Sequence, residues 1–170
     1  DSTGDWSSDV CSSDLLICDQ FIVNRVHEKA LPGFTNEQAA ELVVFGGQCS
    51  DSEIDKHVQA ARNFDYIVGI GGGKTLDTAK AAAHFLGKPV LILPTLASTD
   101  APCTAISVIY NDDDTFNRYL FLSKNPDVVL ADTRVLAEQP PRFFAAGVGD
   151  GLATYFEARA CFAADRKSVV

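Results

Sequence analysis

A strand, a glycine turn and a helix follow one another without a break between residues 65 and 87. Tyr66, Ile67, Val68 and Ile70 form a β-branched and aromatic run typical of a buried parallel strand. Glycines follow at 71–73, and alanine-rich helix formers then extend to Gly87, which is placed to end the helix. Bare backbone N–H groups at the positive end of a helix favour a phosphate or pyrophosphate. The stretch therefore predicts a nucleotide-binding α/β unit.

The sequence of this turn excludes two common nucleotide-binding motifs. A P-loop whose Gly-Lys-Thr occupies residues 73–75 needs a further glycine where the chain has Val68. The dinucleotide fingerprint G-x-G-x-x-G needs glycine at Lys74 or at Leu76, depending on the glycine from which it starts. The turn is therefore a phosphate cradle of another design.

Alternating strand and helix patterns surround this unit. Strands are expected at 15–18, 42–45 and 90–93, and helices at 21–31 and 50–61, the second opened by a Ser50–Glu53 capping box. Right-handed crossovers would stack these strands into a parallel sheet covered on both faces. Further along, a hairpin is expected at 104–122, a strand at 128–131 and a helical part from Pro140 onward. The predicted fold class is α/β, a Rossmann-like parallel sheet with a β-hairpin, followed by the start of a helical domain.

Three carboxylates lie where such folds bind ligands. Asp19 follows the first strand, where it could accept hydrogen bonds from ribose hydroxyls or simply cap the next helix. Asp100 lies in the hydroxyl-rich loop 95–102, which could serve a phosphate, a nicotinamide or a polar substrate, although such residues also make turns. Asp150 is expected in the first turn of a helix, where a capping role is the simpler interpretation and a metal site the alternative. His27 and His57, on the early helices, are expected to face solvent.

Both ends of the chain differ from the rest. Residues 5–15 show no apolar periodicity, and residues 165–170 break off a helical pattern abruptly. Both resemble in-frame translations of sequencing-adapter DNA. We therefore expect adapter-derived segments at 1–14 and 165–170, enclosing a piece of a longer protein.

The composition argues against several classes of partner. With 23 acidic and 14 basic residues the net charge is −9, so a general basic surface for nucleic acid or anionic membrane is not expected. The cysteines lack the C-x-x-C spacing of a metal knuckle. No apolar run reaches the length of a membrane span, and no signal-peptide pattern is visible. We expect a cytoplasmic protein.

Four segments carry a resemblance to a known family: GIGGGKTLDTAK (69–80), PTLASTDAPCTAISVIY (94–110), NRYLFLSKNPDVVLADT (117–133) and AAGVGDGLATYFEARAC (145–161). They are similar to bacterial NAD-dependent glycerol dehydrogenases, which belong to the metal-dependent, iron-type alcohol dehydrogenases and share the fold of dehydroquinate synthase. TLASTDAP and GVGD are specific within this group, whereas GGGK with a later Asp and Lys is shared more broadly. The resemblance implies an NAD-binding α/β domain at 15–139 and the truncated start of a helical metal-binding domain at 140–164.

The resemblance also implies roles for individual residues. Asp100 and Asp150 would be catalytic, the first at the glycerol hydroxyls and the second as a metal ligand, and Asp19 would bind the adenine ribose. The other matched positions would contact NAD. Those that would bind its pyrophosphate are Gly72, Gly73, Lys74, Thr75 and Asp77. Those that would line its nicotinamide half are Thr95, Ser98, Thr104, Ile106 and Tyr110. The two metal-binding histidines of the family have no counterpart, because His27, His57 and His84 fall elsewhere.

The implied reaction is the oxidation of glycerol, or of a related small vicinal diol, to dihydroxyacetone with NAD, while a zinc ion polarises the hydroxyls. The parent protein is expected to be a homo-oligomer without nucleic-acid or membrane partners. Alternatives are another member of the family, such as a glycerol-1-phosphate dehydrogenase, a dehydroquinate synthase or a different metal-dependent alcohol dehydrogenase, and an inactive nucleotide-binding fragment. One carboxylate cannot hold a catalytic zinc, so we expect this chain alone to expose an apolar patch, to be marginally stable and to turn over no glycerol.

Overall fold

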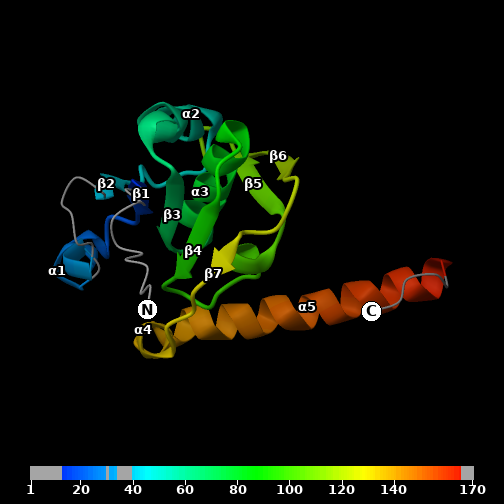
Figure 1. Ribbon diagram of the computed structural model, residues 1–170. Coiled ribbons are helices and arrows are strands. Elements are labelled where there is room, and N and C mark those ends of the chain that lie inside the picture. The colour runs from blue at the N-terminus through cyan, green and yellow to red at the C-terminus, as the bar shows by residue number, and fades with distance from the viewer. Residues whose placement is uncertain (1–12, 30, 34–39, 166–170) are drawn as a thin grey trace, which may run out of the picture.

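The computed structural model describes residues 13–29, 31–33 and 40–165. Most of the two predicted adapter segments, residues 1–12 and 166–170, lies outside the described residues. The centre is a five-stranded parallel sheet of order β2-β1-β3-β4-β7 (Figure 1). Its strands are β1 (Asp14–Cys18), β2 (Ala40–Val44), β3 (Tyr66–Gly71), β4 (Val90–Pro94) and β7 (Val128–Val129). A separate antiparallel hairpin joins β5 (Ile106–Tyr110) to β6 (Phe116–Phe121). The predicted fold class is confirmed.

Helices cover both faces of this sheet. One face packs against α2 (Asp51–Ala60) and α3 (Gly73–Leu86), and the other against α1 (Val23–Lys29). Strand β1 divides its side chains accordingly, since Leu15 and Ile17 enter the first core and Leu16 and Cys18 the second. Both sets are buried, as expected for an inner strand of a parallel sheet.

Shorter elements complete the chain and differ from the expected boundaries by a few residues. Helix α1 is shorter than expected, and Pro32 and Gly33 fall in the 3₁₀ turn η1 (Leu31–Gly33). Strand β7 has two residues where four were expected. The remaining elements are η2 (Ala61–Asn63), η3 (Ala101–Cys103) and α4 (Thr133–Ala137). In the part of the chain that the structure describes, no helix combines the length and apolarity needed to cross a membrane.

The prediction that His57 faces solvent is wrong, whereas His27 is exposed as expected. The His57 side chain is fully buried, and its Nε2 lies 2.8 Å from Oε1 of Glu53. Burial lowers the pKa of His57, although Glu53 opposes that shift. Ser50 caps α2 as predicted, but the carboxylate of Glu53 accepts from the Gly46 amide at 2.7 Å. A polar residue on α2 is thus buried because a neighbour one turn away gives it a partner.

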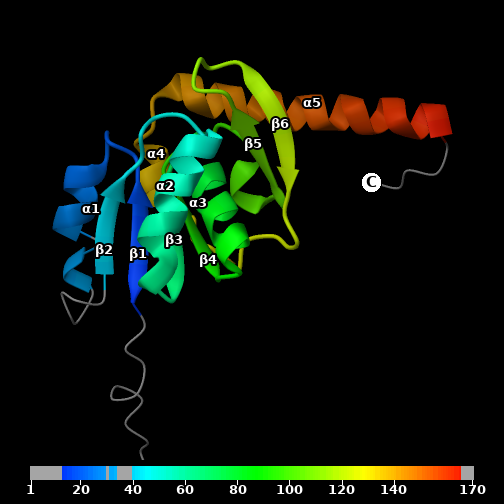
Figure 2. The same cartoon turned by 90° about the horizontal axis from the view of Figure 1, so that it is seen from above.

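The prediction that Asp150 lies in the first turn of a helix is also wrong. Helix α5 (Pro141–Asp165) begins at the predicted proline pair but continues for 25 residues, so Asp150 falls in its interior. Its end projects well beyond the α/β body (Figures 1 and 2). Large apolar side chains along α5 are half or more exposed, which confirms the expected apolar patch. They are Phe144, Val148, Leu152, Tyr155, Phe156 and Phe162.

Candidate functional site

The glycine cradle lies between β3 and α3. Gly72 is the N-cap of α3, and as a glycine it contributes no side-chain cap hydrogen bond. The loop 95–102 folds against the cradle, because the Thr95 amide donates to the Gly71 carbonyl at 3.0 Å. A Cβ built on Gly72 would lie 3.3 Å from Cδ1 of Leu96. The first turn of α3, whose backbone N–H groups lack intrahelical partners, therefore lies next to this loop, and a helix start of this kind favours a pyrophosphate.

Lys74 and Tyr110, both predicted cofactor residues, meet at the rim of the cradle. The Lys74 ammonium lies 5.0 Å from the centre of the Tyr110 ring and 3.8 Å from Oδ1 of Asp114 at the hairpin tip. The Lys74 side chain is 46% exposed. Such a half-exposed cation is loosely held, so it is able to turn toward a phosphate.

Asp77, by contrast, is occupied by contacts within the protein. Its Oδ1 lies 2.9 Å from the Lys80 ammonium, and its Oδ2 accepts from the Val108 amide at 3.0 Å. Burial raises the pKa of the Asp77 carboxyl, although Lys80 opposes that shift. The carboxylate thus joins α3 to the hairpin, and its implied contact with the cofactor stays a prediction.

Asp19 lies at the carboxyl end of β1, beside the cradle. Its Oδ1 accepts from the Phe21 amide at 3.0 Å, which stabilises the turn before α1 and does not cap the helix itself, since α1 begins only at Val23. A Cβ built on Gly71 would lie 3.1 Å from the Cβ of Asp19. This position beside the glycine turn also suits a ribose acceptor.

The structure brings the two predicted catalytic residues, Asp100 and Asp150, into contact. The amide of Asp100 donates to Oδ2 of Asp150 at 3.1 Å, across 50 residues of sequence. Helix α5 approaches the loop so closely that a Cβ on Gly147 would lie 2.0 Å from the Ala97 carbonyl oxygen. The Ala97 amide donates in turn to Oε1 of Gln139, at 2.8 Å. The loop 95–102 is therefore held between the cradle and α5.

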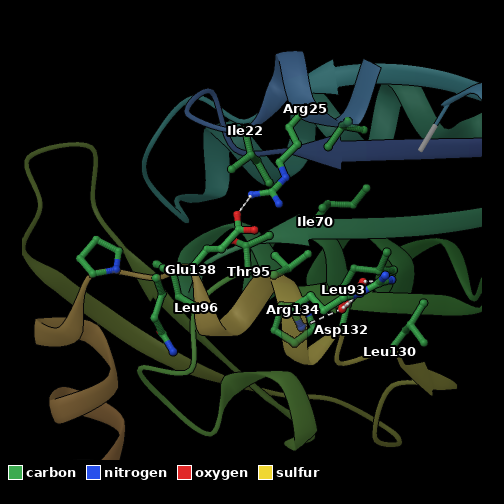
Figure 3. A pocket seen from close by; sticks show the side chains of 15 residues that line it. Ile22, Arg25, Ile70, Leu93, Thr95, Leu96, Leu130, Asp132, Arg134 and Glu138 are labelled. Atoms are coloured by element: carbon green, nitrogen blue, oxygen red, sulfur yellow. Dashed lines mark hydrogen bonds and ion pairs between the residues drawn. The ribbon is translucent and has the colours of Figure 1, made fainter. Parts of the chain in front are cut away.

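A cavity of about 680 Å³ opens on the α1 face of the sheet (Figure 3). Mostly apolar side chains of α1, of the carboxyl ends of β3 and β4, and of the α4 region line it. Arg25 and Glu138 face each other there and form an ion pair of 2.6 Å (Figure 3). Thr95 and Leu96 line this cavity and also belong to the loop that lies against the cradle. Sequence reasoning missed the cavity, whose only local signal is the helical spacing of Ile22 and Val26.

The residues that the structure describes do not form a complete metal centre. Among them, no group of three or more His, Cys, Asp or Glu side chains is placed to hold an ion. His27 is on α1, His57 is buried on α2 and His84 lies in the last turn of α3. Asp150, which lies next to Asp100, could provide one ligand. A single carboxylate does not suffice for a zinc site.

Comparisons with known proteins agree with this architecture. Glycerol dehydrogenase of Escherichia coli O6:H1 is 48% identical over 161 residues, 93% of this chain and 44% of that protein. Glycerol dehydrogenase of Thermotoga maritima is 53% identical over 148 residues, 86% of this chain and 40% of that protein. The crystal structure of a probable glycerol dehydrogenase from Sinorhizobium meliloti 1021 gives a TM-score of 0.80 at 40% identity, covering 87% of this chain and 41% of that one.

A more distant structure is 2-deoxy-scyllo-inosose synthase complexed with carbaglucose-6-phosphate, NAD+ and Co2+, with a TM-score of 0.67 at 26% identity over 81% of this chain and 40% of that one. The chain thus spans less than half the length of each of these relatives. The family model for iron-containing alcohol dehydrogenases matches residues 1–133. The chain therefore belongs to the iron-containing alcohol dehydrogenase family.

Proposed function

We propose that this chain supplies the cofactor-binding half of an NAD-dependent glycerol dehydrogenase. The observation that carries the proposal is the position of the loop 95–102. It is bonded to the glycine cradle on one side and to α5 on the other, so Asp100 and Asp150 meet next to the cofactor site. The relatives named glycerol dehydrogenase support glycerol, or a related small vicinal diol, as the substrate.

The cofactor would lie across the carboxyl ends of the strands. Its adenine fits the apolar cavity under Arg25 and Glu138, and its ribose the carboxylate of Asp19. The pyrophosphate would bind the first turn of α3, where Lys74 offsets its charge. The nicotinamide would then reach the segment with the hydroxyls of Thr95, Ser98 and Thr104, together with Ile106 and Tyr110. When bound, NAD accepts a hydride from the alcohol carbon.

On the substrate side, the chain offers carboxylates. Asp100 and Asp150 are hydrogen-bond acceptors that suit adjacent hydroxyls, and oxidation of glycerol beside them would yield dihydroxyacetone. We propose that Asp150 also provides one ligand of a catalytic zinc, whose other ligands come from outside this chain. We also propose that residues 15–139 form the cofactor domain and that residues 140–164 are the start of a helical domain. The parent protein would be cytoplasmic and homo-oligomeric.

Calorimetric titration of this chain with NAD, with and without zinc, tests the proposed function. We expect NAD to bind with equal affinity in both titrations, because the cradle is complete and the metal site is not. Glycerol should produce no NADH with the chain alone. A chain that circular dichroism shows to be folded, but that gives no heat with NAD, would contradict the proposal.

Asp19 should set the preference for NAD over NADP. Replacing Asp19 with asparagine leaves an oxygen that accepts from the Phe21 amide, so the turn before α1 is kept. The negative charge that repels a 2′-phosphate is lost. We expect the ratio of NAD to NADP affinity to fall about tenfold, a change of about 1.4 kcal/mol in relative binding. An unchanged ratio would leave Asp19 only the role of stabilising this turn.

A further inference from the structure

Lys80 is a buried charge on the second turn of α3. Lys80 is only 1% exposed, and its ammonium group has partners within the protein. It donates to the carbonyls of Ala101 at 2.7 Å, Thr104 at 3.3 Å and Ile106 at 2.6 Å. The carboxylate of Asp77 lies 2.9 Å away. A buried ammonium is tolerated because hydrogen bonds and a counter-charge satisfy it.

The same helical turn holds the start of the hairpin. The Val108 amide donates to the Asp77 carboxylate, and the buried Ser107 hydroxyl donates to the Asp77 carbonyl at 2.9 Å. Together with the three carbonyls on Lys80, five groups between residues 101 and 108 are bound by one turn of α3. The 3₁₀ turn η3 and strand β5 therefore take their position from this helix.

We infer that Lys80, with Asp77, is a positioning residue that sets the geometry between the two halves of the cofactor site, an inference that rests on the proposed function. The first turn of α3 forms the phosphate cradle, and its next turn holds the segment 101–108, which contains Thr104 and Ile106 and directly follows Asp100. One rigid helix thereby fixes the distance from the pyrophosphate to the nicotinamide and substrate side. Neither side chain touches substrate in this arrangement.

A second lysine offers a matched control. Lys88 also donates to three carbonyls, at 2.7 Å for Ala61, 2.7 Å for Arg62 and at short range for Phe64. These contacts lie at η2 and the far end of α3, away from the cradle. Replacing Lys88 with methionine removes as many hydrogen bonds as the same change at Lys80 but leaves the segment 101–108 in place.

The experiment compares Lys80→Met and Lys88→Met with two probes. NADH carries the fluorescent dihydronicotinamide, and ADP-ribose lacks it. We expect Lys80→Met to bind NADH about tenfold more weakly, with bound emission close to that of free NADH, while ADP-ribose affinity stays within twofold. Lys88→Met should lower the melting temperature and leave both affinities within twofold.

Several outcomes would overturn the inference. Equal weakening of NADH and ADP-ribose by Lys80→Met would show a general structural role, and unchanged NADH binding and emission would show no role. If Lys80→Met is unfolded, the double variant D77N/K80M, which leaves no unpaired buried charge, is read in the same way, and its failure to fold overturns the inference too. A folded wild-type chain that binds neither probe would instead contradict the proposed function itself.

Discussion

Replacing Gly147 with alanine is expected to detach α5 from the loop 95–102. A Cβ at this position would lie 2.0 Å from the carbonyl oxygen of Ala97 and 3.0 Å from its carbonyl carbon. These are backbone atoms, so no side-chain rotation relieves the overlap, and the helix or the loop has to move. We expect a loss of at least about 2 kcal/mol from the free energy of unfolding, in the upper range for overpacked sites. The hydrogen bond between the Asp100 amide and Asp150 should be lost with it.

Gly149 provides the matched control, because it lies in the same helix and a Cβ there would have no neighbour within 4 Å. Alanine at Gly149 should stabilise the chain by about 0.5–1 kcal/mol, as expected for replacing glycine inside a helix. Urea unfolding gives both free energies, and hydrogen exchange at the Asp100 amide reports the docking directly. If Gly147→Ala stabilised the chain as Gly149→Ala does, the close approach of α5 to the loop would be refuted.

The α/β architecture was predictable because its signals are local. The run from Tyr66 to Ile70, the glycines after it and the alanines before Gly87 each specify one element, and their order leaves a parallel sheet as the economical arrangement. The cradle and Asp19 were predictable for the same reason, since parallel strands bring their carboxyl ends to one edge. The place of Asp100 in a loop at that edge followed in the same way.

Contacts across the fold gave no such signal. Lys80 and His57 are polar, so apolar periodicity assigns them to the solvent side, although each is buried with a partner one turn away. In the sequence, Gly147 is only a residue of low helix propensity. The close approach of the loop, which leaves no room for a side chain at this position, is seen only in the folded chain. Gly147, Gly149 and Gly151 are poor helix formers, yet α5 runs through them without a break, so Asp150 lies in its interior and not in a first turn.

The cavity was missed for a related reason. It is formed by α1 and the α4 region, which lie far apart in sequence and meet through Arg25 and Glu138. Neither residue belongs to a recognisable motif, and a single arginine or glutamate on a short helix is ordinarily a solvated charge. Only the folded chain shows that the apolar residues between them enclose a space beside the cradle.

Replacing Gly72 with alanine should separate cofactor binding from folding. The backbone of Gly72, with φ −90° and ψ −179°, suits any residue, so the start of α3 should persist and the melting temperature should change little. The added methyl group would lie 3.3 Å from Cδ1 of Leu96, at the helix start that we propose binds the pyrophosphate. We expect NAD affinity to fall at least thirtyfold, a loss of about 2 kcal/mol.

A double variant shows which overlap is responsible. If the new methyl group acts only by displacing Leu96, then G72A/L96A should bind NAD as well as Leu96→Ala does alone. If it occupies the space of the phosphate, the double variant should remain at least tenfold weaker than Leu96→Ala, since shortening Leu96 does not remove the methyl group at residue 72. We expect the second result, because phosphate binding at a helix start depends on close approach to bare backbone N–H groups. Wild-type affinity in Gly72→Ala would show that the dinucleotide does not lie against this glycine.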